Sequence, residues 1–175
     1  MESKAKVLGH PAHPILIVFP LGLLATSVIF SLIYLFTDND TMSVVSYWMT
    51  VAGILGGLVA AVPGVVDWIA IPSGTRAKRV GAIHGLGNVV VLVLFVLSWL
   101  LRRDEPSYVP STLALIISLL AFVIAGVTGW LGGELVDRLG VGVDRHANLN
   151  APNALTVRHV PESEVSPSGP HSHSL

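Results

Sequence analysis

Three histidines and two carboxylates are the residues of this sequence best suited to bind a metal ion or to move protons. They are His10, His13, Asp67, His84 and Glu134. Imidazole nitrogens and carboxylate oxygens form a mixed ligand set that suits zinc, iron or manganese. Each of the five lies near one end of a long apolar segment, and these ends meet if the segments run alternately up and down. The sequence therefore predicts a polar cluster at one end of a helical bundle.

His84 is the most informative of these residues, because it lies about one helical turn inside an apolar segment, where an ionisable side chain is costly. His13 should lie at a similar depth on another helix. Two neutral imidazoles that face each other across a bundle can ligate the iron of haem b, with Arg76, Lys78 or Arg79 near the propionates. A non-haem iron or zinc site is the second interpretation. In a third, His84 only hydrogen-bonds Asp67 or a carbonyl that Pro63 leaves free.

The carboxylates also have a purely structural interpretation. Asp67 could pair with Arg76 or Lys78, and Glu134 with Arg138, as anchors at the membrane interface. These residues alone do not decide between ligand, proton carrier and anchor.

The absence of cysteine excludes disulfides, thiolate nucleophiles, iron–sulfur clusters ligated by cysteine and covalently attached haem. The sequence also lacks the P-loop, the G-x-S-x-G, the H-E-x-x-H and the dinucleotide-binding signatures. No basic and aromatic surface typical of nucleic-acid binding is evident. Whether the protein is an enzyme is left open, and a non-catalytic role is favoured.

Four apolar segments must position the candidate residues. They span about residues 15–36, 44–66, 80–101 and 113–135, each close to the roughly 20 residues that cross a bilayer. Hydrophobic residues make up 52% of the chain and charged residues 12%, with a mean hydropathy of +0.71. A soluble domain has about a quarter charged residues. The sequence predicts an all-α integral membrane four-helix bundle, up-and-down, over residues 1–143.

The remaining residues, 144–175, are rich in Asn, Pro, Ser and His and are expected to form a largely disordered polar tail. Basic residues are concentrated on the side of the spans that carries both termini. These are Lys4, Lys6, Arg76, Lys78, Arg79, Arg138 and Arg145, against Arg102 and Arg103 on the other side. The positive-inside rule places both termini in the cytoplasm. Tyr47, Trp48 and Trp99 are expected to be aromatic anchors on the outer side.

Small residues predict the packing faces of the helices. In the second segment a stripe at helical spacing leads toward Asp67 and indicates close contact between helices. It consists of Gly53, Gly57, Ala60, Ala61 and Gly64. In the fourth segment Ala125, Gly129 and Gly133 form another such ridge, beside a row of Gly126, Trp130 and Glu134.

Several motifs together resemble the bacterial membrane family catalogued as domain of unknown function 2231. They are the opening Gly9-His-Pro-Ala-His-Pro14, the turn Asp67-Trp-Ile-Ala-Ile-Pro72, His84 with Asn88, and Gly129-Trp-Leu-Gly-Gly-Glu-Leu-Val136 followed by Gly140-Val-Gly-Val143. The resemblance extends to about Val157 and implies a location in the bacterial inner membrane. It implies that His10, His13, Asp67, His84 and Glu134 are the polar motif residues. Asp137 departs from the family pattern, which commonly has tyrosine there, and is left outside the predicted site.

Some members of this family carry a fused Rieske-type iron–sulfur domain, so the resemblance implies electron transfer and a redox partner of that kind. The leading hypothesis is a membrane protein that holds haem b, or a non-haem iron or zinc, between His13 and His84, with the other residues as supporting groups. The competing hypothesis is a non-catalytic scaffold or accessory subunit whose polar cluster is structural. A solute path comes third, since four helices would require a homo-oligomer. The lipid bilayer is a partner in all three.

Overall fold

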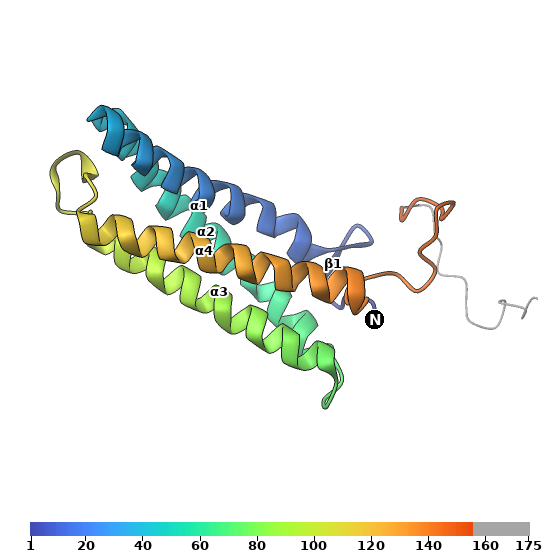
Figure 1. Ribbon diagram of the computed structural model, residues 1–175. Helices are drawn as coiled ribbons and strands as arrows, with labels where there is room; N and C mark the ends of the chain where they lie inside the picture. Colours follow the sequence, from blue (N-terminus) through green and yellow to red (C-terminus); the bar gives the residue numbers. More distant parts are fainter. Residues whose placement is uncertain (156–175) are drawn as a thin grey trace, which may run out of the picture.

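The computed structural model describes residues 1–155 and has four long helices, α1 Ala12–Thr37, α2 Asp40–Ala70, α3 Arg76–Leu100 and α4 Thr112–Gly133. A single π-helical turn, η2 (Glu134–Arg138), continues α4, and a 3₁₀ turn, η1 (Pro106–Tyr108), lies between α3 and α4. All four helices are long and apolar enough to span a membrane. They run up and down, with the N-terminus and the segment after α4 at the same end (Figure 1). The predicted all-α bundle is confirmed.

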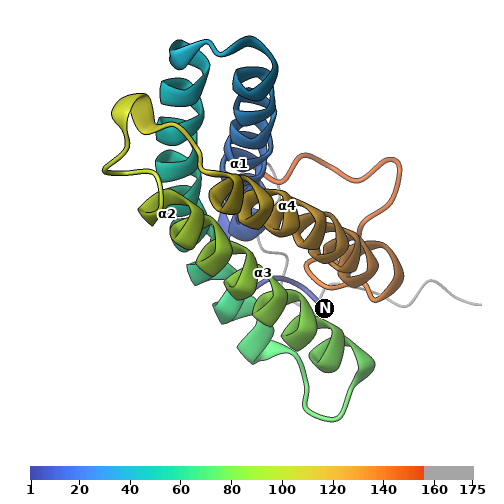
Figure 2. The ribbon, with the colours of Figure 1, turned by 60° about the vertical axis from the view of Figure 1, so that its left-hand side comes forward.

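The helices form two hairpins. α1 packs chiefly against α2, and α3 chiefly against α4, with fewer contacts between the pairs. Figure 2 shows α3 and α4 running obliquely to α1. Between the hairpins lies an apolar core built from Leu24, Val28, Ile54, Val91, Phe95 and Ala121. The core therefore holds the hairpins together near mid-length, and other groups must hold them toward the ends.

Every helix begins or ends beyond the apolar segment that predicted it. α2 starts at Asp40 and not at about 44, because the Asn39 side chain accepts a hydrogen bond from the amide of Thr41. Thr75 and Ser111 cap α3 and α4 in the same way. Hydropathy marks only the part of a helix in the hydrocarbon region, whereas capping side chains set its actual end.

The start of α1 includes His13, although a proline follows this residue. The proline after His13 indicates a non-helical conformation for that residue, but α1 begins at Ala12 and includes His13. Proline is tolerated in the first turn, where amides lack partners within the helix. Before α1, strands β1 (Lys6–Val7) and β2 (His10–Pro11) form a short antiparallel hairpin. Its turn residues Leu8 and Gly9 both have positive φ.

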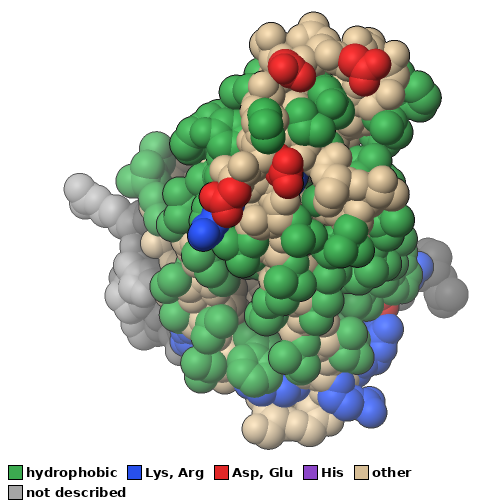
Figure 3. All heavy atoms as spheres, turned by 90° about the vertical axis from the view of Figure 1, so that its left-hand side faces the viewer, with side chains coloured by type: hydrophobic (Ala, Val, Ile, Leu, Met, Phe, Trp, Pro, Cys, Tyr) green, Lys and Arg blue, Asp and Glu red, His purple; other side chains and the backbone are tan. Residues whose placement is uncertain are grey.

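The surface divides into an acidic end, a wide apolar belt and a basic end. We call the end with Asp38, Asp40, Asp104 and Glu105 the acidic end, and the end with the seven basic residues named above the basic end. Figure 3 looks onto the acidic end, with hydrophobic side chains around it and Lys and Arg beyond them at the lower edge. Exposed aliphatic side chains along all four helices fit contact with lipid. Of the predicted polar tail, residues 144–155 form turns and irregular backbone, and the rest lies outside the described residues.

Candidate functional site

His13 and His84 come together between the two hairpins, as the sequence predicted. His13 lies in the first turn of α1, and His84 lies in the third turn of α3. Their ring centroids are 6.3 Å apart, and the ring planes are nearly perpendicular at 87°. Both side chains are half-buried. The pair therefore joins the first hairpin to the second toward the basic end.

Each imidazole is oriented by a backbone carbonyl of the neighbouring helix in its own hairpin. Nδ1 of His13 lies 2.7 Å from the carbonyl oxygen of Ala60, and Nδ1 of His84 lies 2.8 Å from that of Thr128. A carbonyl oxygen accepts hydrogen bonds, so both Nδ1 atoms carry the proton and act as donors. In this tautomer Nε2 is left with a lone pair, which is the form that binds metals.

His84 has a further partner in its own helix. The Asn88 amide nitrogen lies 3.2 Å from Nε2 of His84, and the Thr128 hydroxyl donates to the Asn88 amide oxygen at 2.9 Å. The backbone carbonyl of His84 accepts from the same amide nitrogen at 3.0 Å, and this contact fixes which way the amide points, with its NH₂ toward the histidine. Asn88 thus occupies the lone pair of His84 in this structure, and its amide must move before that nitrogen can bind anything else.

Glycines leave the room that the rings occupy. A Cβ at Gly64 would come within 2.9 Å of Nδ1 of His13, and one at Gly132 within 3.2 Å of Cε1 of His84. The predicted packing stripe of α2 follows the same rule, because a Cβ at Gly53 would meet Leu24 at 2.6 Å and one at Gly57 would meet Leu92 at 2.7 Å.

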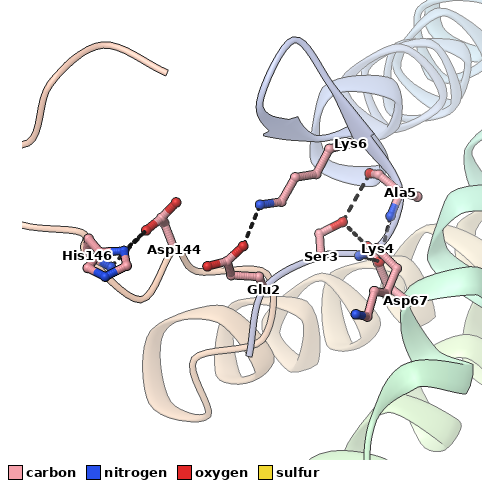
Figure 4. A network of polar contacts seen from close by, with 8 residues as sticks. All are labelled: Glu2, Ser3, Lys4, Ala5, Lys6, Asp67, Asp144 and His146. Atoms are coloured by element: carbon pink, nitrogen blue, oxygen red, sulfur yellow. Dashed lines mark hydrogen bonds and ion pairs between the residues drawn. The ribbon is translucent and has the colours of Figure 1, made fainter. Parts of the chain in front are cut away.

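Asp67 lies near the end of α2 and binds the N-terminal segment, not the histidines. Its carboxylate accepts hydrogen bonds from the Ser3 hydroxyl at 2.7 Å and from the amides of Lys4 and Ala5 at 2.6 and 3.2 Å (Figure 4). Three donors on one partly buried carboxylate fix the segment across the basic end. The predicted pairing of Asp67 with Arg76 or Lys78 is not observed, because the N-terminal segment takes up the carboxylate.

Glu134 also has a different partner from the predicted Arg138. It pairs with Arg76 at 2.6 Å, so the ion pair joins the start of α3 to the end of α4. Lys78 instead donates to the carbonyl of Trp68 and lies 4.1 Å from the centre of that indole ring. His10 is exposed in β2. Among residues 1–155, no three His, Asp or Glu side chains form a group that could hold a metal ion. The structure brings His13 and His84 together and does not bring the other three candidates to them.

Arg102 is a buried cation that the sequence did not reveal. The sequence predicts that Arg102 flanks a span on the outer side, yet the residue is 2% exposed. Its guanidinium donates to the carbonyls of Ser43 and Tyr108 and to the hydroxyls of Ser31, Ser43 and Ser46, over 2.9–3.5 Å. Burial lowers the pKa of Arg102 to about 10, so the group stays charged at neutral pH. The sequence signal that could have indicated a buried polar partner such as Arg102 is the set of serines at 27, 31, 43 and 46. All four are buried in the structure.

Tyr47 also differs from the prediction. It is 6% exposed and stacks on Tyr108 with centroids 3.9 Å apart. Tyr47 is therefore part of the packing beside Arg102, and Trp48, 56% exposed, is the better candidate for an outer aromatic anchor.

Comparison with known proteins identifies the class of this chain as a predicted membrane protein. Residues 9–145 match the family described as predicted membrane protein (DUF2231). The chain belongs to this family, as its motifs indicated. No curated protein and no solved structure gives a significant match.

Proposed function

We propose that this protein holds a redox metal, in the form of haem b, between His13 and His84 and takes part in electron transfer at the membrane. The observation that carries the proposal is the meeting of two imidazoles from different hairpins, 6.3 Å apart, each with Nδ1 on a backbone carbonyl. A metal-ligating histidine typically donates its other ring N–H to such an acceptor, which fixes the ring and its tautomer.

The number of ligands favours haem over the other metals considered. A structural or catalytic zinc site takes at least three protein ligands, and non-haem iron commonly takes two histidines and a carboxylate. The described residues offer two imidazoles and no third ligand beside them. Haem would need only the imidazoles of His13 and His84 from the protein, because the porphyrin would supply the other ligands of its iron.

The ring separation fits such a pair. His13 and His84 lie close enough to hold one group together, since their ring centroids are 6.3 Å apart. When bound, haem would supply reversible one-electron chemistry. The chain's own residues would orient the rings, because the carbonyls of Ala60 and Thr128 accept the Nδ1 protons. The Asn88 amide would have to move away from Nε2 of His84 to free that nitrogen as a ligand.

The charge distribution supports an orientation with the basic end in the cytoplasm, which places the histidine pair toward the inner leaflet. The redox partner would then approach the cytoplasmic side. The family resemblance favours a Rieske-type or another redox protein as that partner.

The test uses the full chain purified in detergent after expression with added haem precursor. We expect a Soret band that shifts on dithionite reduction and is lost in both His13→Ala and His84→Ala. His10→Ala is the matched control, because it removes an exposed imidazole from the same N-terminal region and should keep the band. A colourless wild-type protein that also fails to bind added haemin would contradict the proposal, as would a band that survives both variants.

A second candidate is the non-catalytic scaffold, and one observation favours it. The nitrogens of His84 already have the partners Thr128 and Asn88, so the pair can serve to join helices without any ligand. In that case the protein binds no haem and added haemin leaves the thermal stability of the wild-type protein unchanged. His84→Ala then lowers the thermal stability relative to wild type by the same amount with or without haemin.

A further inference from the structure

A hollow that neither His13 nor His84 lines opens at the basic end of α4. It has a volume of about 300 Å³ and is lined by Trp130, Gly133, Glu134, Asp137 and Arg138. The π-helical turn Glu134–Arg138 supplies most of this lining. One extra residue in that turn changes the directions of Asp137 and Arg138 relative to a continued α-helix, and such turns are frequent at functional sites.

The lining carries both signs of charge together with an exposed aromatic ring. Trp130 is 69% exposed, and the side chains of Asp137 and Arg138 are exposed too. Within residues 1–155, no ion pair involves Asp137 or Arg138, whereas Glu134 pairs with Arg76. An anion and a cation next to each other, both lacking a charged partner, complement a ligand that itself carries both charges.

The depth of the hollow in the membrane indicates which part of a lipid it contacts. α4 and η2 form one candidate span, Pro106–Arg138, so its last turns lie at the membrane interface. Tryptophan at this depth is typical of the headgroup region. The hollow therefore opens toward phospholipid headgroups of the leaflet at the basic end.

The surface beside the hollow also fits an acyl chain. Gly126, Gly129 and Gly133 lie on the same face of α4 as Trp130, and a Cβ added at any of these glycines would have no atom within 4 Å. The backbone of α4 is thus uncovered along a row that leads from the hollow toward the middle of the bilayer. An apolar chain can approach a helix closely at such positions.

We propose that this hollow binds a phospholipid whose headgroup carries a primary ammonium and a phosphate, of the phosphatidylethanolamine class. The ammonium lies against the face of Trp130 and donates to the Asp137 carboxylate. Arg138 binds the phosphate, and one acyl chain follows the glycine row. The site is independent of the histidine pair, so a failure of either proposal leaves the other standing.

The ammonium separates this lipid from its competitors. Choline carries a quaternary ammonium with no N–H to donate, and phosphatidylglycerol has no positive group to satisfy Asp137. The test is native mass spectrometry of the delipidated full chain with phosphatidylethanolamine, phosphatidylcholine or phosphatidylglycerol of equal chain length. We expect phosphatidylethanolamine to bind at least tenfold more tightly than the other two.

Variants and a soluble competitor complete the test. Asp137→Asn should abolish the tenfold preference, and Asp137→Glu should retain it, which guards against a mere folding defect. Arg79→Gln, at the basic end but outside the hollow, is the matched charge control for Arg138→Gln, which should weaken all three lipids. Equal binding of the three lipids would overturn the proposal, and so would an unchanged preference in Asp137→Asn. Displacement of the lipid by equimolar glycerophosphoethanolamine would also overturn it, because the headgroup alone would then be the ligand.

Discussion

Hydrogen bonds to backbone carbonyls and hydroxyls position the polar residues buried between these helices. Arg102 uses serine hydroxyls and two carbonyls, and His13 and His84 use the carbonyls of neighbouring helices. In hydrocarbon an unsatisfied polar group costs several kcal/mol, and these three side chains find their acceptors inside the protein. A neutral acceptor set leaves the charge of Arg102 uncompensated but fully hydrogen-bonded.

We expect Arg102→Leu to destabilise the protein by on the order of 3 kcal/mol, because it removes the donor from several buried oxygens at once. Arg103→Leu is the matched control, since the Arg103 side chain is 54% exposed and pairs with Asp104 next to it in the chain. Its effect should stay within about 0.5 kcal/mol. The measurement is unfolding in mixed detergent micelles followed by circular dichroism. Equal losses in the two variants would mean that Arg102 is not the anchor that its contacts indicate.

Asp67 gives a second prediction for a single residue. Asp67→Ala removes the acceptor for the amides of Lys4 and Ala5, so hydrogen exchange at these amides should accelerate about tenfold or more. Glu2→Gln is the control, because Glu2 pairs with Lys6 inside the same segment. If exchange at residues 4 and 5 were unchanged in Asp67→Ala and the variant lost a metal that the wild-type protein binds, Asp67 would instead be a metal ligand.

At the scale of the helix, the surroundings of each glycine decide whether it can be replaced by a larger residue. Gly53→Ala places a methyl group within 2.6 Å of Leu24 and should cost about 1–3 kcal/mol through overpacking. Gly126→Ala meets no atom within 4 Å and should be neutral or stabilise α4 by about 0.5–1 kcal/mol. The same micelle unfolding assay compares them. A larger loss for Gly126→Ala would show that the glycine row of α4 is covered in the assembled protein.

The same glycines show how far the sequence determines the helices. The stripe from Gly53 to Gly64 predicted real contacts, because helices that approach closely need small residues wherever they cross. By spacing alone, the ridge in α4 could not be distinguished from the stripe in α2. A Cβ at Gly129 or Gly133 would nevertheless have open space around it. Spacing identifies a face of a helix and does not tell whether protein or lipid covers that face.

For the whole molecule, the two hairpins are joined at three depths. The histidine pair joins them toward the basic end, the apolar core joins them near mid-length, and Arg102 joins them at the acidic end, where it links the end of α3 to α1 and α2. The convergence of His13 and His84 was predictable, because both lie near the same end of alternating helices. The partners of Asp67, Glu134 and Arg102 were not, because each is set by the rotation of its helix and by a loop or terminal segment whose path apolar periodicity does not encode.

The orientation of the whole bundle can be measured without altering its background, because the chain contains no cysteine. Ser73→Cys introduces a thiol in the exposed turn between α2 and α3 at the basic end, and Asp104→Cys introduces one in the exposed loop at the acidic end. The excess of basic residues predicts that the basic end stays in the cytoplasm. In intact spheroplasts a membrane-impermeant maleimide should therefore label Asp104→Cys and leave Ser73→Cys unlabelled until the cells are lysed. The reverse pattern would place the histidine pair in the outer leaflet, and a redox partner in the cytoplasm could then no longer reach it from the nearer side.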